Sequence, residues 1–355
     1  MPSAKKTTWL VKRYNPMRIL LSSYHFFPSV GGTETVAAVL AKGFVRSGHV
    51  VKLVTNTPSN QINDTFPYEV IRRPSVFKHL KLTAWADLVF HNHISLRNAW
   101  PMLFIHRPWV VTHHQWIAKD RLNGRLKRFV LRWATQISVS SVIAADFQQQ
   151  SVVINSPYDE DVFRETSGLR REKDLVFLGR FVPEKGLPVL LHALVLLRKD
   201  GLQPNLTVVG KGPEEQAWRI LTDELGLSAQ VKFVGVKMGY ELTELLNSHK
   251  VLVVPSVWNE PFGVVALEGM ACGCIVVGSE GGGLKEAIGP GGLTFPNGDA
   301  EALAVCIRKT LFDQQIISRC LLDSKAHFKK YTGKAIANRY LDLFRDVVKT
   351  IPREE

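Results

Sequence analysis

Short apolar runs alternate with amphipathic segments along most of this chain, and this alternation constrains the fold more than any other feature. The apolar runs predict strands at 18–23, 50–55, 88–91, 109–112, 136–139, 152–155, 175–178, 205–209, 231–234 and 251–255. The segments between them predict helices that include 33–47, 188–198, 213–225 and 240–247. Strands that take turns with helices form parallel sheets covered by helices. We therefore expect an α/β protein.

The alternation is interrupted once, over a polar stretch at 155–171 that contains Pro157 and Gly168. Such a stretch suits a hinge between domains. With 355 residues, of which 45% are hydrophobic, the chain is long enough to bury two cores. The pattern therefore predicts two doubly wound parallel-sheet domains in tandem. Ligands of such sheets bind beyond the carboxyl ends of the strands, so the loops after the strands are where chemistry is expected.

Charge is divided unequally between the two halves. Residues 1–170 hold 22 lysines and arginines against 10 acidic residues, a balance of +12, whereas residues 171–355 hold 23 against 22, a balance of +1. A basic first half favours a polyanionic partner, either anionic membrane lipid or nucleic acid. No apolar stretch approaches the ~18 residues that span a bilayer. The first sixteen residues carry Lys5, Lys6, Lys12 and Arg13 without an apolar core of signal-peptide length, so secretion is not expected.

The four cysteines all lie in the last third of the chain, at 272, 274, 306 and 320. Their spacing matches neither a metal site nor a disulfide framework. Cys272 and Cys274 lie within an apolar run, where small buried side chains are expected. We interpret all four as reduced thiols, which favours a cytoplasmic location.

The segment 254–268 (VPSVWNEPFGVVALE) is the strongest candidate for chemistry. A loop after a buried strand runs there into a helix whose first turn is small and apolar, and the free N–H groups of such a turn form an anion site suited to phosphate. Glu260 lies at the mouth of this helix and Glu268 a little over two turns further, so both can face one ligand. On its own the segment fits equally well a helix-capping Glu260 and a solvated Glu268.

This segment resembles the E-x7-E motif of the family 4 retaining glycosyltransferases. Further motifs agree in family order: G-R-x-x-x-x-K-G at 179–186, G-x-G-P at 210–213, G-G-G-L-K-E at 281–286 and N-G-D at 297–299. The likeness covers nearly the whole chain, is most specific from 175 to 305, and weakens across the first half. It implies the GT-B fold, in which two Rossmann-like domains face a central cleft. The implied domains are 17–157 on the acceptor side, with a returning helix at 334–350, and 172–334 on the donor side.

The resemblance also implies a role for each matching residue. Arg180 and Lys185 neutralise the donor diphosphate and stabilise the leaving nucleotide, although a surface salt bridge is the alternative. Glu268 binds the ribose hydroxyls, and Glu260 holds the transferred sugar. The backbone amides of Phe262, Gly263 and Val264 approach the phosphate or sugar, and Gly210 belongs to the donor-facing turn. Asp299 is left as a turn or helix-cap residue.

In the first half, the stretch 28–34 (PSVGGTE) resembles the family's glycine-rich loop, which faces the donor phosphate and the acceptor. Gly31 and Gly32 are therefore donor-site candidates, because glycine allows backbone to come close to a ligand. A dinucleotide site would instead need G-x-G-x-x-G followed by an acidic residue about 20 positions on, and this loop lacks that spacing. Nicotinamide-dependent oxidoreduction is therefore disfavoured.

Histidines cluster at 91, 93, 106, 113 and 114, close to the ends of two predicted strands. By alignment with the family, His114 fits the residue that touches the donor sugar near its reacting carbon, and His113 is the second choice. The catalytic set is then Glu260, His114, Arg180 and Lys185. A histidine cluster could in principle hold a metal, and the residues 159–161 form a D-x-D. Because that D-x-D lies in the interdomain linker, no metal and no other cofactor is expected.

The stretch 116–133 interleaves bulky apolar residues with six cations against one acid, at nearly helical spacing. It predicts an interfacial helix that binds anionic lipid. The alternative is an ordinary helix with a buried apolar stripe and a solvated basic face. The candidate acceptor or membrane contacts are His93, His113, Arg121, Arg125, Lys127 and Arg128.

Taken together, the resemblance implies an enzyme that transfers a hexose from a nucleotide-sugar to a glycan or lipid-linked acceptor with retention of configuration. A UDP-hexose such as UDP-glucose is the first expectation for the donor and GDP-mannose the second. The setting we expect is bacterial lipopolysaccharide or exopolysaccharide biosynthesis, in the cytoplasm and peripherally at the inner face of the membrane. The alternatives are a nucleotide-sugar epimerase of the same fold and a non-catalytic polyanion-binding protein. Nucleic acid is the less favoured partner, because it leaves the motifs of the second half unexplained.

Overall fold

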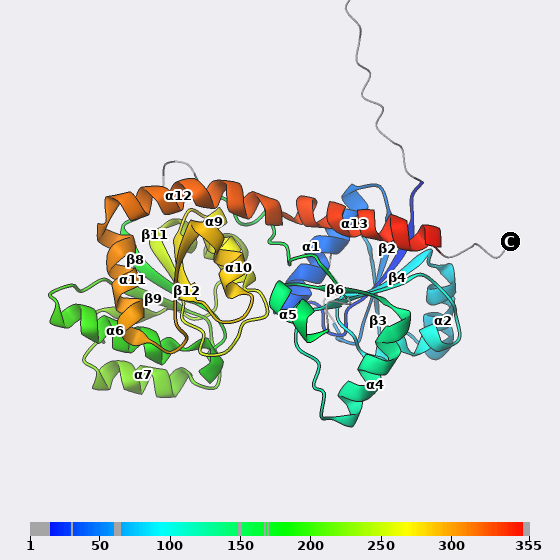
Figure 1. Cartoon of the computed structure of the whole chain (residues 1–355), viewed down its shortest axis with the longest axis horizontal. Coiled ribbons are helices and arrows are strands. Elements are labelled where there is room, and N and C mark those ends of the chain that lie inside the picture. Colours follow the sequence, from blue (N-terminus) through cyan, green and yellow to red (C-terminus); the bar gives the residue numbers. More distant parts are fainter. Residues whose placement is uncertain are drawn as a thin grey trace, which may run out of the picture.

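The structure is a computed structural model that describes residues 15–29, 31–59, 65–147, 151–166, 168 and 170–350. The basic residues Lys5, Lys6, Lys12 and Arg13 lie outside the described part of the chain. Two α/β domains lie side by side, the first drawn in blue to green and the second in green to orange (Figure 1).

The first domain is built on a fully parallel sheet of seven strands in the order β3-β2-β1-β4-β5-β6-β7. Its strands are β1 Arg18–Ser22, β2 Val50–Thr55, β3 Glu69–Arg72, β4 Leu88–His91, β5 Trp109–His113, β6 Thr135–Ser138 and β7 Ser151–Val153. Its helices are α1 Gly32–Arg46, α2 Val76–Trp85, α3 Leu96–Ala99, α4 Leu122–Val130 and α5 Ser141–Asp146, with short 3-10 turns η1 Trp100–Leu103 and η2 Leu131–Trp133.

The second domain repeats this plan with a parallel sheet of six strands in the order β10-β9-β8-β11-β12-β13. Its strands are β8 Lys173–Leu178, β9 Leu206–Val209, β10 Val231–Phe233, β11 His249–Val254, β12 Ile275–Ser279 and β13 Gly292–Phe295. Its helices are α6 Leu187–Lys199, α7 Glu215–Glu224, α8 Gly239–Asn247, α9 Val264–Ala271, α10 Leu284–Ile288, α11 Ala300–Phe312 and α12 Gln314–Phe328. Its 3-10 turns are η3 Pro183–Lys185, η4 Gly289–Gly291 and η5 Lys329–Tyr331.

The expected α/β class and the two parallel sheets are confirmed, and the structure adds three strands that the sequence pattern did not reveal. β3 is a four-residue strand with charged ends at the edge of its sheet. β12 follows α9 after only three residues, so that helix and strand form one apolar run in the sequence. β13 is four residues long and follows a glycine-rich turn. The predicted helix over 116–133 was too long, since α4 begins only at Leu122.

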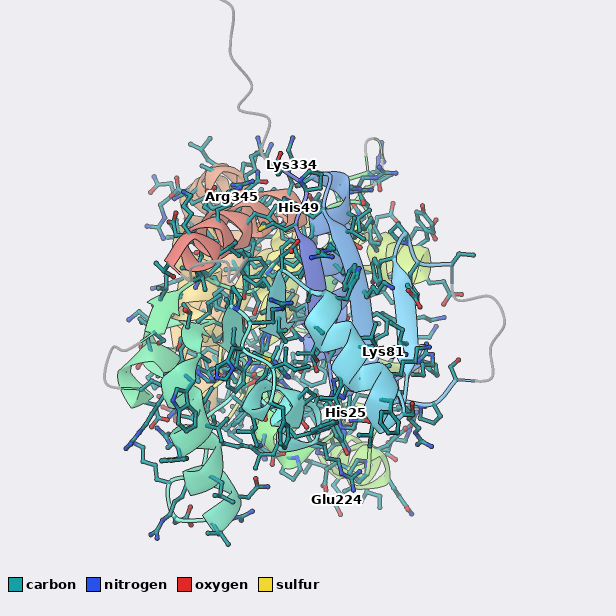
Figure 2. The ribbon with its side chains drawn as sticks, turned by 90° about the vertical axis from the view of Figure 1, so that its right-hand side faces the viewer. His25, His49, Lys81, Glu224, Lys334 and Arg345 are labelled. Atoms are coloured by element: carbon teal, nitrogen blue, oxygen red, sulfur yellow. The ribbon has the colours of Figure 1, made fainter. Side chains whose placement is uncertain are left out.

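Helix α13, Gly333–Thr350, belongs to the first domain although it follows the second in sequence. Its residues Tyr340 and Phe344 are fully buried against Phe44 of α1 and Phe90 of β4. Figure 2 looks onto the first domain and shows this helix, with Lys334 and Arg345, passing close to His49 at the top. The chain therefore completes the core of its first domain with its last helix.

The linker between the domains is fixed by its acidic residues. Asp161 forms ion pairs with Lys42 and Arg46 of α1, and the Glu160 carboxylate accepts hydrogen bonds from the backbone N–H groups of Gly333 and Lys334 at the start of α13. The D-x-D at 159–161 thus contacts α1 and the start of α13. Beside it, the N–H of Tyr158 donates to the carbonyl oxygen of Tyr331 at 3.0 Å, so the two chain crossings between the domains run together.

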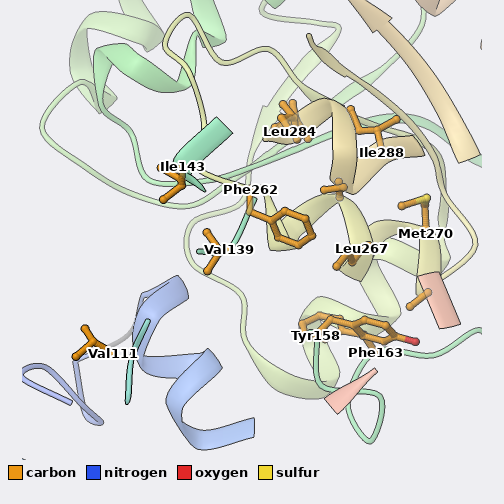
Figure 3. Packing of buried hydrophobic residues seen from close by; sticks show 14 of the residues in the cluster. Val111, Val139, Ile143, Tyr158, Phe163, Phe262, Leu267, Met270, Leu284 and Ile288 are labelled. Carbon is orange, nitrogen blue, oxygen red and sulfur yellow. The ribbon is translucent and has the colours of Figure 1, made fainter. Parts of the chain in front are cut away.

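An apolar junction of buried side chains joins the two domains. Val139 and Ile143 of the first domain and Phe262, Leu267 and Leu284 of the second belong to one buried cluster (Figure 3). Because this cluster is continuous, the two sheets hold a defined relation to one another in this state of the protein.

Candidate active site

The candidate residues gather where the strand order of each sheet reverses. In the first sheet this switch point lies between β1 and β4, and in the second between β8 and β11. The glycine-rich loop follows β1, the G-R-x-x-x-x-K-G loop follows β8, and the loop with Glu260 follows β11. Switch points at the carboxyl ends of strands are the usual ligand sites of doubly wound sheets.

Three loops of the second domain are locked together by their backbones. The N–H of Phe181 donates to the carbonyl of Lys211 at 2.9 Å, and the N–H of Val257 donates to the carbonyl of Glu184 at 3.0 Å. A Cβ at Gly210, whose φ is +135°, would overlap the carbonyl oxygen of Gly179. Glycine at this position therefore lets the loop after β9 pack directly on the loop that carries Arg180.

Lys185 and Glu260 form the central charged contact of the site. The Lys185 ammonium donates to Glu260 Oε1 at 2.5 Å, and the Ser256 hydroxyl donates to the same oxygen at 2.6 Å. Glu260 is only 6% exposed. With Oε1 held in this way, Oε2 is left to accept a hydrogen bond from a ligand hydroxyl.

Arg180 lies on the same loop as Lys185 but is exposed to solvent. It makes no ion pair or side-chain hydrogen bond with any residue in the described part of the chain. The loop thus presents one cation that is already paired and one that is free, and a diphosphate can engage both.

Glu268 lies in the second turn of α9 and is partly buried. Burial, with a smaller effect from the nearby charge of Asp159, raises the pKa of its carboxyl group to about 7. Among the described residues its carboxyl group has no hydrogen-bond partner. A partly buried carboxylate without a partner favours a ligand that brings hydroxyl groups.

The remaining residues of this loop contribute main-chain atoms to the site. Phe262 points its ring into the interdomain core and is 3% exposed, so only its main chain can reach a ligand. Gly263, with φ of +102°, precedes the first turn of α9, which begins at Val264. Gly283 donates its N–H to the carbonyl of Glu260 at 2.7 Å, which ties the glycine triplet to the same loop. Asp299 caps α11 through the N–H of Ala302, as expected.

In the first domain, Gly31 and Gly32 form the start of α1, and Val30 before them lies outside the described residues. A Cβ at Gly31 would overlap the carboxyl group of Glu34, which is itself buried. The loop is therefore fitted closely to the first turn of the helix. The free N–H groups of that turn lie directly after the loop that follows β1, at the carboxyl end of the sheet, where ligands of parallel sheets bind.

His114 is tied to this loop through one intermediate. Its Nε2 is 3.1 Å from Asn92 Oδ1, and Asn92 Nδ2 donates to the carbonyl of Thr33 at 2.8 Å. Burial lowers the pKa of His114 to about 3, with smaller effects from His93 and His113. The imidazole is therefore neutral at pH 7, and the contact with Asn92 fixes the orientation of the ring.

The other histidines differ from His114 in their surroundings. His113 is fully buried, stacks on Phe147 at 4.0 Å between ring centroids, and lies 3.0 Å from Gln136 Oε1. This packing holds the His113 ring in the interior of the first domain. His93 is near His113, His114 and Lys127, and burial lowers its pKa to about 4. His106 is exposed on the loop before β5.

The basic segment divides into two kinds of side chain. Arg121 and Arg125 are exposed and Lys127 is partly so, whereas Arg128 is bonded to Asp146 and to the carbonyl of Ile117. Arg128 is therefore committed to holding α4 on the domain. Four apolar residues of α4 and η2 are exposed on one helical face: Leu122 at 75%, Leu126 at 46%, Phe129 at 51% and Trp133 at 61%. α4 projects from the body of the first domain (Figure 1).

Among the residues that the structure describes, no three histidine, cysteine, aspartate or glutamate side chains come together in a group that could hold a metal ion. None of the helices in the described ranges is both long and apolar enough to cross a bilayer. All four cysteines, which are described, are free thiols.

Comparison with known proteins now decides the family. Residues 159–334 match the family of the glycosyl transferases group 1. This segment, which contains the second domain, belongs to that family.

Three curated proteins are similar to about half of this chain. It is 31% identical over 198 residues to a D-inositol 3-phosphate glycosyltransferase of Corynebacterium efficiens, covering 52% of this chain and 46% of the relative. It is 34% identical over 185 residues to the protein of that name from Stackebrandtia nassauensis, covering 49% and 42%. It is 29% identical over 181 residues to a phosphatidyl-myo-inositol mannosyltransferase of Mycobacterium leprae, covering 50% and 48%. The match thus spans about half the length of these relatives or less.

Solved structures confirm the GT-B fold of the chain. HepE from Anabaena, solved with UDP and glucose, aligns with a TM-score of 0.77 at 20% identity, over 93% of this chain and all of the other. A sucrose-phosphate synthase from Thermosynechococcus elongatus aligns with a TM-score of 0.75 at 24% identity, over 95% of this chain and all of the other. The resemblance to family 4 glycosyltransferases is confirmed.

Several residues of this site were not found from the sequence. Asn92, Ser256 and Glu286 make contacts that bring different segments together, and the sequence patterns gave none of the three a role. Glu286 lay within a recognised motif, but its bond to Ser141 in the other domain depends on the domain arrangement. Only the three-dimensional fold shows such partners.

Proposed function

We propose that the protein is a glycosyltransferase that transfers a hexose from a nucleoside-diphosphate sugar to an acceptor hydroxyl with retention of configuration. The observation that carries the proposal is the joining of Lys185, Glu260 and Ser256 from two loops at one switch point, with the unpaired cation Arg180 beside them. This set offers two cations for a diphosphate and an oriented carboxylate for sugar hydroxyls.

The donor would bind mainly to the second domain. Arg180 and Lys185 would contact the diphosphate, and the N–H groups at the start of α9, near Gly263 and Val264, would contact a phosphate or sugar oxygen. Glu268 would accept hydrogen bonds from the ribose hydroxyls, and Gly210 would leave room beside the diphosphate. With these cations and N–H groups present, the diphosphate needs no metal ion, and we propose a metal-independent enzyme.

The transfer step would take place between the two domains. The bond between the anomeric carbon and the diphosphate oxygen breaks, and the electron pair leaves with the nucleoside diphosphate. The acceptor oxygen forms its bond on the same face of the sugar, and its proton passes to the departing phosphate. Arg180 and Lys185 stabilise the charge that develops on that phosphate, while His114 and Glu260 hold the sugar. Gly31 and Gly32 would close over the diphosphate from the first domain, which excludes water.

For the donor we propose UDP-glucose or another UDP-hexose first, because HepE, which shares the fold, was solved with UDP and glucose. GDP-mannose comes second, since one relative is a mannosyltransferase. For the acceptor we propose a glycan or lipid-linked glycan of bacterial lipopolysaccharide or exopolysaccharide biosynthesis. The proposed division of labour keeps 17–157 with the helix 334–350 on the acceptor side and 172–334 on the donor side.

Exposed apolar and basic groups on α4 support a peripheral position at the inner face of the cytoplasmic membrane. The stripe of Leu122, Leu126, Phe129 and Trp133 is flanked by Arg121, Arg125 and Lys127, which suits an anionic bilayer. The double change Leu126→Glu and Phe129→Glu should abolish sedimentation with phosphatidylglycerol vesicles without altering the melting temperature. Equal binding of native and changed protein to those vesicles would refute the membrane contact.

The first experiment on the activity is a thermal-shift panel with UDP, GDP, ADP and their sugar conjugates. Ligand binding to the folded state raises the melting temperature by mass action. We expect one nucleotide to raise it in the native protein, and Arg180→Ala and Glu268→Ala to lose that rise. The matched controls Lys232→Ala and Glu224→Ala remove an exposed cation and an exposed acid of the same domain and should keep it.

Three other results, one from this panel and two from product analysis, would reject the proposal. Epimer formation from the donor without acceptor would indicate an epimerase of the same fold. A rise with heparin and none with any nucleotide would indicate a polyanion-binding protein. Product with inverted anomeric configuration would exclude the retaining mechanism.

A further inference from the structure

Two tryptophans from different domains meet beside the candidate active site. Trp116 lies two residues after His114, and Trp258 lies two residues before Glu260. Their ring centroids are 6.2 Å apart and the ring planes are inclined by 66°. Trp116 lies in the loop after β5 of the first sheet, and Trp258 lies in the loop after β11 of the second. The pair therefore spans the domain junction at the site itself.

Residues of α4 hold the loop of Trp116 in place. Arg128 Nη2 donates to the carbonyl oxygen of Ile117 at 2.8 Å, and the same guanidinium is paired with Asp146 and lies 4.8 Å from the ring centre of Phe147. The side chain of Ile117 is buried, and Gly124 of α4 packs directly on the carbonyl of Ala118. Arg128 is thus a positioning residue for the segment that carries Trp116.

The loop of Trp258 is held in an equivalent way. Asn297 Nδ2 donates to the carbonyl oxygen of Trp258 at 3.1 Å, while Asn297 Oδ1 accepts from the N–H of Gly281 at 2.9 Å. The preceding residue, Val257, donates its N–H to the carbonyl of Glu184. Each tryptophan therefore stands on a backbone that a polar side chain or neighbouring loop fixes.

Exposure separates this pair from the packing around it. Trp258 is 36% exposed and Trp116 is partly exposed, whereas Glu260 and His114 beside them are buried. A contact that served only to join the domains would be expected to bury both rings, as the neighbouring junction buries Phe262. Large rigid aromatic surface left open beside buried polar groups is typical of ligand sites.

Resting on the proposed function, we propose that Trp116 and Trp258 form the acceptor subsite and that it takes the pyranose ring of a glycan. A pyranose has an apolar face of C–H groups that packs on an aromatic ring and a rim of hydroxyls that needs polar partners. The tryptophans supply the first, and because each lies two residues from His114 or Glu260, they place the hydroxyls of the ring beside the transferred sugar that those two residues hold. The donor anchors Arg180, Lys185 and Glu268 belong to the second domain alone, whereas this pair needs both domains. The subsite therefore selects an acceptor that ends in a sugar over one that ends in a bare polyol or lipid phosphate.

The kinetic test compares Trp258→Ala, Trp116→Ala and Trp258→Phe with the control Trp85→Ala, which removes a partly exposed tryptophan on α2. Activity is followed as nucleotide release from UDP-glucose with methyl pyranosides, disaccharides, myo-inositol and glycerol phosphate as acceptors. We expect a pyranoside or disaccharide to be used, and each alanine variant at the pair to raise its KM tenfold or more. The donor KM and the melting-temperature rise with UDP should stay within twofold of native, and Trp258→Phe should recover most of the loss. Equal changes in donor and acceptor KM, or values equal to those of Trp85→Ala, would overturn the proposal.

A binding test keeps the inference separate from the proposed activity. Tryptophan fluorescence is titrated with the same pyranosides in the presence of UDP, for native protein, the double variant Trp116→Phe and Trp258→Phe, and Trp85→Ala. A saturable change in native protein and in Trp85→Ala that the double variant lacks supports the subsite, whether or not turnover is seen. The absence of a saturable change in native protein, or its survival in the double variant, overturns it. Failure of UDP to shift the native melting temperature would count against the proposed transferase and not against this assignment.

Discussion

Both domains carry candidate residues in loops at the carboxyl ends of the strands, but different kinds of contact hold those loops. In the second domain, backbone fixes the site: Gly210 packs on the loop of Arg180, and Gly283 donates to the carbonyl of Glu260. In the first domain, buried side chains do so, as in the series from His114 through Asn92 to Thr33. Backbone contacts demand glycine at fixed spacing, whereas side-chain contacts accept many residue pairs. This difference explains why the second domain carries recognisable motifs and the first does not.

The two domains also differ in how they respond to protons. The first domain buries His91, His113 and His114 and partly buries His93, and burial lowers the pKa of each. The second domain instead partly buries the acid Glu268, whose pKa is raised. The predictions below test this contrast and the link between the domains.

Acidification should unfold the first domain before the second. The pKa values of about 4 for His91, His93 and His113 and about 3 for His114 lie below the ordinary value of 6.5. The unfolded chain therefore binds more protons, and the stability that is complete above pH 6.5 is lost as the pH falls to about 4. Each histidine contributes up to about 3 kcal/mol. Hydrogen exchange read by domain between pH 8 and 4 measures the effect.

The second domain provides the comparison for that experiment. It holds His249, with a pKa of about 4, and His327, whose pKa is lowered by burial, so a smaller loss is expected there. His106→Gln, at an exposed histidine, should leave the profile unchanged. Simultaneous loss of protection in both domains would contradict the contrast.

Phe344→Ala should destabilise the first domain by about 3–5 kcal/mol, because it opens a cavity among Phe44, Phe90 and Tyr340. Protection in the second domain should be unaffected, and the rise in melting temperature with nucleotide should persist there. Leu322→Ala on exposed α12 is the control and should change stability little. Equal destabilisation of both domains would show that they unfold as one unit.

Glu268→Gln should stabilise the protein at pH 8 while weakening nucleotide binding. The folded state holds the proton up to a pKa of about 7, whereas the unfolded carboxyl group loses it near 4.5. Ionisation therefore costs stability increasingly between pH 4.5 and 7, and the amide removes a cost of about 3 kcal/mol at pH 8 but little at pH 5. Chemical denaturation at the two pH values measures this. A variant equally affected at both values would rule out the raised pKa.

Glu286→Ala should have the smallest effect, a loss of about 1 kcal/mol confined to the link between the domains. Its carboxylate in α10 accepts from the N–H and hydroxyl of Ser141 at the start of α5 and from Asn155 Nδ2 at 3.4 Å. Calorimetry should show a broader or split transition, and Glu286→Gln, which keeps an acceptor, should remain closer to native. An unchanged transition would assign the coupling to the apolar junction alone.

The sequence predicts the architecture well because buried strands of a parallel sheet are short apolar runs separated by helices. It fails where that contrast disappears, as between α9 and β12, or where a strand lies at an edge, as β3 does. It proposes Arg180, Lys185, Glu260 and Glu268 through resemblance, since their loops keep a fixed spacing. The pairing of Lys185 with Glu260, and the contact of Trp116 with Trp258, join segments far apart in the chain. Local sequence contains no signal for such contacts.

The adjacent crossings at Tyr158 and Tyr331 give the protein a modular character. Seen along the gene, the second domain is an insertion into the first, and its two ends meet at neighbouring residues. An exchange of everything between these two points would replace the second domain as a single cassette and leave the other core, including α13, intact. Under the proposed division of labour, recombination at this one place offers a route to new donor specificity while the acceptor side stays unchanged.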